Sequence, residues 1–204
     1  MATPEIPSAD RFQPVVLEGR VVRLEPLTIH HHGALCEVGL DPELWRWTTS
    51  VVHSASDLRA YIEAARRGEA AGSALPFATV LREGARVVGS TRFGNIDREN
   101  RRVEIGWTWV ARPWQRTAVN TEAKLLMMEH AFERMGCVRV EFKTDSLNER
   151  SRAALLGIGA REEGTLRNHM IAPGGRLRHS VYYSVIDSEW PAVKRALESR
   201  LARV

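Results

Sequence analysis

The feature that most constrains the fold is a strand that runs directly into a helix. Residues 103–110 read Val-Glu-Ile-Gly-Trp-Thr-Trp-Val, and the apolar side chains at the odd positions predict a strand with one apolar face. Apolar residues spaced by three and four predict a helix over 118–135, which ends before Gly136. The first N–H groups of such a helix lack partners, and its dipole favours negative charge. The segment from Arg112 to Glu122 is therefore predicted to bind an anion.

The remaining pattern predicts one mixed α/β (α+β) domain rather than two. Strands are expected near 15–24 (two short ones), 75–81, 87–95, 138–144, 160–170 and 178–186, and helices near 28–40, 54–71, 148–156 and from 188. This order predicts a central, mixed but mostly antiparallel, twisted sheet of about seven strands flanked by helices. We expect an N-terminal arm over 1–14, a domain over 15–187, and a C-terminal helix over 188–204 that packs on the domain.

Composition excludes several classes of protein. No apolar run approaches the ~20 residues of a membrane helix, and the first ten residues lack the pattern of a signal peptide. We therefore expect a cytoplasmic protein. Cys36 and Cys137 are too few for a disulfide framework. No metal is predicted, because the consecutive histidines at 30–32 would point in different directions on a helix.

The chain is basic, with a net charge of +4, and only three of its 29 basic residues are lysines. An arginine excess can indicate a nucleic-acid partner. Here the arginines are scattered and stand beside acids, as in residues 97–104, and they form no basic stripe with interleaved aromatic residues. A nucleic-acid partner is therefore not expected, and some arginines are available for the phosphates of a cofactor.

Three motifs, taken together, resemble the GNAT acetyltransferases. The run from Gln115 to Asn120 resembles motif A, a Gln/Arg-x-x-Gly-x-Gly/Ala signature at the start of the central helix. Residues 103–110 resemble the strand before that motif. Residues 148–152 with 156–160 resemble motif B, which is Asn-x-x-Ser followed by Leu-Gly-Phe. The likeness extends over 15–186 and is nearest to the branch of the ribosomal-protein N-terminal (alanine and serine) acetyltransferases.

The resemblance implies a direct transfer of acetyl from acetyl-CoA to a primary amine, either a protein N-terminus or a small-molecule amine. It also implies that the strand at 107–110 splays from the strand at 138–144, with no metal involved. The residues expected to hold acetyl-CoA lie at the end of the first strand, in motif A and in motif B: Trp109, Val110, Gln115, Arg116, Thr117, Ala118, Val119, Asn120, Thr121, Asn148 and Arg150. A homodimer is possible, and no membrane partner is expected.

The chain departs from the family pattern at three positions. Ala118 and Asn120 occupy positions where glycine or alanine is usual, and glycine lets the backbone come close to a pyrophosphate. Leu155 stands where many members carry a tyrosine that is proposed to protonate the leaving thiolate. These departures leave open an alternative, a regulatory module that binds CoA or another anion and catalyses weakly.

Three residues are candidates for catalysis, and each has a structural alternative. Glu104 shares a strand face with Gly106 and is the first candidate for the general base, but it could instead be a carboxylate paired with Arg92 or Arg102. His169 is the second candidate base, or a structural histidine. Ser151 could bond the leaving thiolate, or only cap its own helix.

Overall fold

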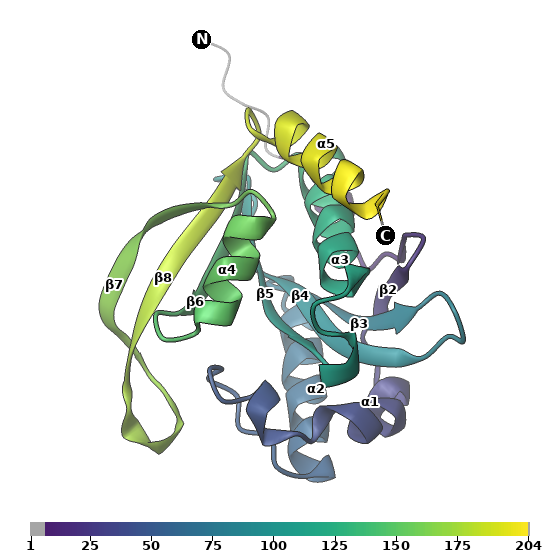
Figure 1. Cartoon of the computed structure of the whole chain (residues 1–204), viewed down its shortest axis with the longest axis vertical. Helices are drawn as coiled ribbons and strands as arrows, with labels where there is room; N and C mark the ends of the chain where they lie inside the picture. Colours follow the sequence, from purple (N-terminus) through teal and green to yellow (C-terminus); the bar gives the residue numbers. More distant parts are fainter. Residues whose placement is uncertain (1–6, 204) are drawn as a thin grey trace.

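A computed structural model describes residues 7–203, which form one sheet with helices on both faces (Figure 1). The sheet has eight strands in the order β1-β2-β3-β4-β5-β6-β8-β7. The strands are β1 (Leu17–Glu18), β2 (Val22–Pro26), β3 (Leu75–Leu81), β4 (Val87–Asp97), β5 (Arg102–Val110), β6 (Arg139–Asp145), β7 (Arg161–Ile171) and β8 (Leu177–Ile186). About seven strands were expected in the sheet, and the structure has eight. Part of the predicted N-terminal arm, residues 1–6, lies outside the described residues.

Every neighbouring pair of strands is antiparallel except β5 and β6. Their parallel pairing covers only three residues of each strand, Arg102–Glu104 opposite Arg139–Glu141. Strand β6 instead pairs with β8 along its whole length. The two halves of the sheet therefore diverge beyond Glu104, and Figure 1 shows β6, β8 and β7 turning away from β5. This confirms the predicted splay.

The helices are α1 (His32–Gly39), α2 (Ala55–Ala70), α3 (Ala118–Glu129), α4 (Glu149–Gly157) and α5 (Trp190–Leu201). Helix α2 begins where its sequence predicts, because the Ser54 side chain accepts a hydrogen bond from Asp57 N. The predicted helix over 118–135 is α-helical to Glu129 and ends in a π-helical turn, His130–Arg134. Within residues 7–203, no helix is long and apolar enough to cross a membrane.

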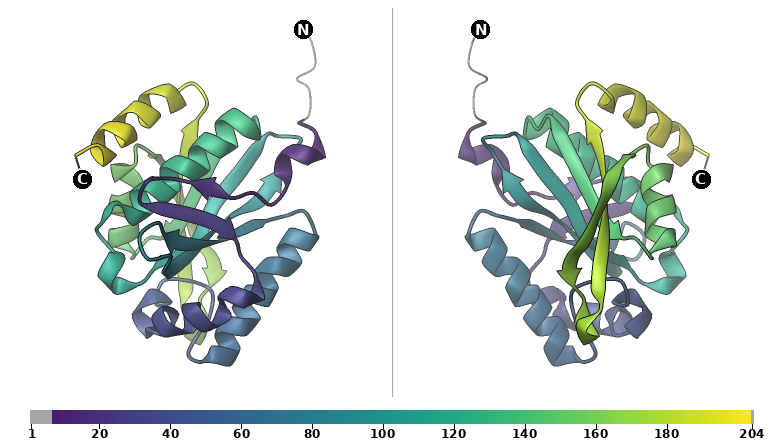
Figure 2. Two further views of the ribbon diagram at one scale, coloured as in Figure 1. Left: turned by 90° about the vertical axis from the view of Figure 1, so that its right-hand side faces the viewer. Right: turned by 90° about the vertical axis from the view of Figure 1, so that its left-hand side faces the viewer.

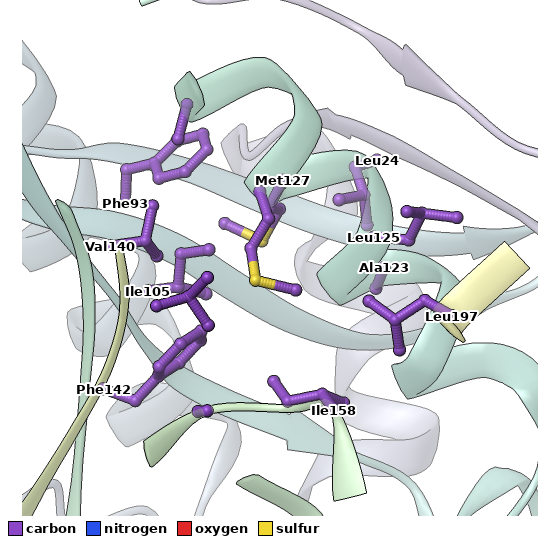
Figure 3. Close-up of a cluster of buried hydrophobic side chains, with 14 of the residues drawn as sticks. Leu24, Phe93, Ile105, Ala123, Leu125, Met127, Val140, Phe142, Ile158 and Leu197 are labelled. Atoms are coloured by element: carbon purple, nitrogen blue, oxygen red, sulfur yellow. The ribbon is translucent and has the colours of Figure 1, made fainter. Parts of the chain in front are cut away.

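Two hydrophobic cores lie on opposite faces of the sheet. The main core lies under α3 and α5, and Figure 3 shows part of it, including Phe93, Ile105, Met127 and Phe142. The second core joins α1 and α2 to β3 and the end of β5, and Trp109 lies in it. Helices α1 and α2 cover only the part of this face that β3 and the end of β5 form. The hairpin of β7 and β8 comes last in the strand order and therefore lies at the sheet edge (Figure 2).

A β-bulge in β5 changes which residues face each core. Ser90 faces Trp109 and Arg92 faces Gly106, so Thr91 alone lies opposite both Trp107 and Thr108. Trp107 has a φ of 48°, in the left-handed region. The predicted single apolar face of residues 103–110 was therefore wrong: Val103 and Ile105 lie in the main core, whereas Trp109 lies in the second.

Candidate active site

The loop between β5 and α3 has the geometry of an anion site. Arg116 has a φ of 63°, a conformation that costs a non-glycine residue about 1 kcal/mol or more and is frequent at functional sites. Thr117 caps α3 by accepting a hydrogen bond from Val119 N. Among the described residues, the N–H groups of Arg116 and Thr117 donate no hydrogen bond. The loop therefore offers free donors and the exposed side chains of Arg116 and Thr117 at a helix start.

Gln115 connects this loop to both sides of the splayed sheet. Its amide nitrogen donates to Val110 O at 2.7 Å, and its amide oxygen accepts from Arg150 Nη1 at 2.9 Å. Arg150 belongs to the first turn of α4, which follows β6. Three of the predicted cofactor residues are thus in direct contact where β5 and β6 have separated.

Several other predicted cofactor residues have side chains that are hydrogen-bonded or buried within the protein. Asn148 caps α4 by accepting a hydrogen bond from Ser151 N at 3.1 Å, which leaves the asparagine NH₂ group for a ligand. The side chains of Ala118 and Val119 are buried in the main core, as is that of Leu155. Thr121 is also buried, and Asn120 is partly exposed, with a buried side-chain oxygen that has no partner among residues 7–203.

Trp109 and Val110 differ in what they present to the opening. The Trp109 ring is buried against Trp45, with ring centroids 5.4 Å apart, and its backbone lies opposite Ser90 of β4, so this predicted cofactor residue does not face the opening. Ala111 N donates to Val88 O of β4. Because backbone groups alternate along a strand, those of Val110 point away from β4, toward the opening.

Glu104 is buried on the face of the sheet opposite α3. It is only 3% exposed, and its Oε2 accepts hydrogen bonds from Asn95 Nδ2 at 2.7 Å and from Lys143 Nζ at 3.2 Å. The expected structural partners, Arg92 and Arg102, were wrong, because the register brings Lys143 of β6 to this carboxylate instead.

The second oxygen of Glu104 has no such partner. Within the described residues Oε1 accepts no hydrogen bond, and a Cβ placed on Gly106 would lie 2.9 Å from it. The missing side chain at Gly106 therefore makes room for the Glu104 carboxylate itself, whose Oε1 keeps its lone pairs free of hydrogen bonds from the described residues.

His169 of β7 faces the same polar region. Its ring lies 5.8 Å from that of Tyr182, and its Nδ1 is buried without a partner within residues 7–203. Burial lowers the pKa of His169 below its ordinary value, and the charges of Lys143 and Arg178 lower it further. The imidazole is therefore mostly neutral near pH 7 and can accept a proton.

Backbone outliers concentrate around this region. Asn95, Trp107 and Asn168 all have positive φ values, 48°, 48° and 49°, and each lies at an irregularity in strand pairing. Asn95 bonds Glu104, and Asn168 precedes His169 in the chain. Bulges that redirect side chains are frequent next to active sites.

A cavity of about 1030 Å³ borders the same face. Asn95 and Tyr182 belong to its lining, together with residues of the β4–β5 turn and of β7. No residue from Arg112 to Glu122 lines this cavity. It is therefore separate from the loop before α3, and its lining residue Asn95 is the one that bonds Glu104.

Sequence reasoning missed several residues of this site. Asn95 of β4, Lys143 of β6 and Arg178 of β8 lie on three different strands, and only the cross-strand register brings them to the face that holds Glu104. Each is a polar residue within a strand, and no motif in the neighbouring sequence marks it as part of a site.

The splayed sheet, with free N–H donors at the helix start beside it, points to a class of protein. Residues 22–161 match the family model described as "Acetyltransferase (GNAT) domain". Because this match covers well over half of the chain, the chain belongs to the GNAT acetyltransferase family.

Individual relatives agree with this assignment. The chain is 35% identical over 107 residues to a Bacillus subtilis (strain 168) protein named "Putative ribosomal N-acetyltransferase YdaF", a match over 52% of this chain and 57% of that one. The chain thus spans little more than half the length of this curated relative.

Solved structures share the fold over nearly the whole chain. A GCN5-related N-acetyltransferase from Brucella melitensis is 30% identical, with a TM-score of 0.84, over 97% of this chain and 86% of that one. Mycobacterium smegmatis RimJ in complex with CoA-disulfide has a TM-score of 0.80 at 24% identity, over 93% of this chain and 96% of that one, which shows the shared fold alone.

Proposed function

We propose that this protein transfers an acetyl group from acetyl-CoA directly to a primary amine. One observation carries the proposal: the pairing of β5 and β6 ends at Glu104, between an anion-binding helix start on one face and a buried carboxylate on the other. A cofactor and an amine can then meet in the opening from opposite faces of the sheet.

The cofactor would be held by the residues around this opening. The free N–H groups at Arg116 and Thr117, with the Arg116 guanidinium, suit a pyrophosphate. Backbone groups of Val110 would pair with the pantetheine arm, and Asn148 would bond it through its NH₂ group. Acetyl-CoA, when bound, supplies the activated thioester.

The amine must lose a proton to attack the thioester. Glu104 Oε1 would accept this proton, directly or through a water molecule, while Lys143 and Asn95 hold the other oxygen. The amine nitrogen forms a bond to the carbonyl carbon, the carbon–sulfur bond breaks, and the thiolate leaves. Ser151 in the first turn of α4 would bond this thiolate. His169 is the second candidate for the base.

The acceptor is proposed to be a protein N-terminus or a small-molecule amine, in the cytoplasm. The name of the YdaF relative favours a protein acceptor. Free thiol released from acetyl-CoA, measured over a panel of amines and N-terminal peptides, tests the proposal when mass spectrometry identifies an N-acetyl product. Binding of CoA without any acetylated product would instead support the alternative of a weakly catalytic binding module.

A homodimer is a further proposal. The hairpin of β7 and β8 leaves β7 as an exposed sheet edge, and exposed edges can pair with another chain. Sedimentation of the purified protein would give its oligomeric state.

A further inference from the structure

Arg92 of β4 carries a buried positive charge without a counter-ion. The residue is 8% exposed, and its guanidinium carbon lies 5.0 Å from the ring centroids of both Tyr61 and Trp107. Within residues 7–203 its guanidinium takes part in no hydrogen bond or ion pair, and its Nε is buried without a partner. Stacking between two rings fixes the group but satisfies none of its donors, so a buried charge here calls for an anion.

Arg178 of β8 is a second guanidinium on the same face, and it is only partly satisfied. It is 6% exposed, its Nη1 lies 3.5 Å from Trp47 O, and its Nε finds no hydrogen-bond partner in the part of the chain that the structure describes. The nearest carboxylate oxygen, Asp145 Oδ2, is 4.0 Å away and is bonded more closely by Arg176. Burial lowers the pKa of Arg178, which indicates that its neighbours do not fully compensate the charge.

The charges on this face do not balance. The buried carboxylates on this face, within residues 7–203, are Glu104, paired with Lys143, Asp145, paired with Arg176, and Glu141, paired with Arg102 and Arg139. Arg92 and Arg178 are then in excess, while His169 is mostly neutral because its pKa is lowered. The region therefore has room for one more negative charge.

An anion bound by Arg92 would not be a phosphate of the cofactor. Phe93, next to Arg92 in β4, is buried in the main core on the side of α3. Because side chains alternate along a strand, Arg92 points to the face opposite α3 and opposite the Arg116 loop. It faces the same side as Glu104, since its register partner is Gly106, over which the Glu104 carboxylate lies.

We propose that Arg92 and Arg178 form an anion subsite that selects acceptor amines carrying a carboxylate near the amine. This inference rests on the proposed function, because it places the acceptor beside Glu104. Planar guanidinium groups bind carboxylates through two parallel hydrogen bonds. The chemistry fits an N-terminal peptide with an acidic residue close to its amine, or a free amino acid.

Matched acceptors test the subsite. Two amidated peptides, beginning Ser-Asp-Glu and Ser-Asn-Gln, have nearly the same shape and differ in charge, and free glutamate compared with its diamide distinguishes a small acceptor from a peptide. We expect kcat/KM to be at least tenfold higher for the acidic member of one pair. Arg92→Gln and Arg178→Gln should each bring that ratio toward one, mainly by raising KM, whereas Arg134→Gln, at the exposed end of the π-helical turn after α3, should leave it unchanged.

The outcomes separate this proposal from the proposed function. Ratios near one in the unmodified protein, or a ratio that both arginine variants preserve, would overturn the subsite. If no amine is acetylated, the proposed function fails, and calorimetry of the acidic peptide without acetyl-CoA then tests the subsite by itself. Binding that is lost in the charge-neutral peptide and in Arg178→Gln would support the subsite, and equal binding of both peptides would refute it. Arg178→Gln also serves if Arg92→Gln does not fold.

Discussion

Lys124 of α3 places an amine inside the main core. Its Nζ donates to Thr108 Oγ1 at 2.7 Å and lies 3.4 Å from Thr91 Oγ1, and within the described residues no carboxylate bonds it. Burial lowers the pKa of Lys124 to about 7. Thr91 of β4 and Thr108 of β5 belong to the two strands that pair at the β5 bulge. The amine therefore links α3 to this irregular part of the sheet.

The unusual pKa of Lys124 predicts a pH dependence of stability. In the unfolded chain this pKa is about 10.4, so between about pH 7 and pH 10 the unfolded state binds more protons, and stability rises with pH. Lys124→Met removes this cost. We expect the free energy of unfolding to increase by about 1–4 kcal/mol at pH 7, with a smaller gain at pH 10, measured by urea denaturation.

A matched lysine provides the control. Lys194 bonds Glu129 at 2.9 Å and Glu133 at 2.8 Å, and hydrogen bonding to Glu133 raises its pKa. Lys194→Met should therefore give no such gain at pH 7. Equal pH dependence of stability in the unmodified protein and in Lys124→Met would contradict the account of the buried amine.

Helix α3 is attached to the β1–β2 hairpin by one carboxylate. Glu122 is 4% exposed and accepts hydrogen bonds from the backbone N–H groups of Arg20, Val21 and Val22 at 2.7–3.0 Å. A Cβ at Gly19 would lie 2.4 Å from this carboxylate, so only glycine fits there. The acid therefore has a structural role, although it lies at the end of the predicted anion-binding segment.

Glu122→Gln should destabilise the fold. The change removes the negative charge from the three N–H groups and turns an NH₂ group toward some of them, so we expect a loss of about 2–4 kcal/mol in urea denaturation. Glu129→Gln is the control, because Glu129 lies on the same helix with a 41% exposed side chain. That control should change stability by less than about 1 kcal/mol. A similar loss of unfolding free energy in both variants would show that the Glu122 hydrogen bonds stabilise the fold no more than an exposed carboxylate does.

The loop before α3 should determine the affinity for CoA. Arg116→Ala removes an exposed guanidinium next to the free N–H groups, so we expect CoA to bind about 3–10 times more weakly by calorimetry. The residual binding should depend less on salt, because one phosphate contact is lost. Arg112→Ala, at the start of the same loop, removes a guanidinium that bonds Asp41, and it should leave the affinity unchanged. If Arg112→Ala weakens binding as much as Arg116→Ala, the pyrophosphate is not held where we place it.

At the scale of the whole molecule, periodicity and capping were enough to predict most elements of the fold. Helix α2 begins at the predicted cap, and the strand and helix on either side of Arg116 lie where the pattern places them. The order of motifs resembled a known family, and that resemblance supplied the splay of the sheet. Local patterns are reliable here because they depend on neighbouring residues along one chain segment.

The polar site could not be predicted in the same way. The bulge at Trp107 reverses the facing of the residues after it, and no local signal marks it. Lys143 reaches Glu104 only through the parallel register of β5 and β6, two strands separated by a helix. The stacking of Arg92 depends on α2 as well as on the sheet. These contacts join distant segments, and a single sequence does not specify their register.

The central claim is that Glu104 accepts the proton of the amine in an acetyl transfer at the splayed strands. The most direct measurement is kcat of Glu104→Gln beside that of Glu141→Gln, a buried carboxylate at the register partner on β6 that bonds Arg102 and Arg139. We predict that Glu104→Gln lowers kcat by about 100-fold or more with unchanged CoA affinity, while Glu141→Gln retains most of its activity. An unchanged rate and pH profile in Glu104→Gln would contradict the account and turn attention to His169.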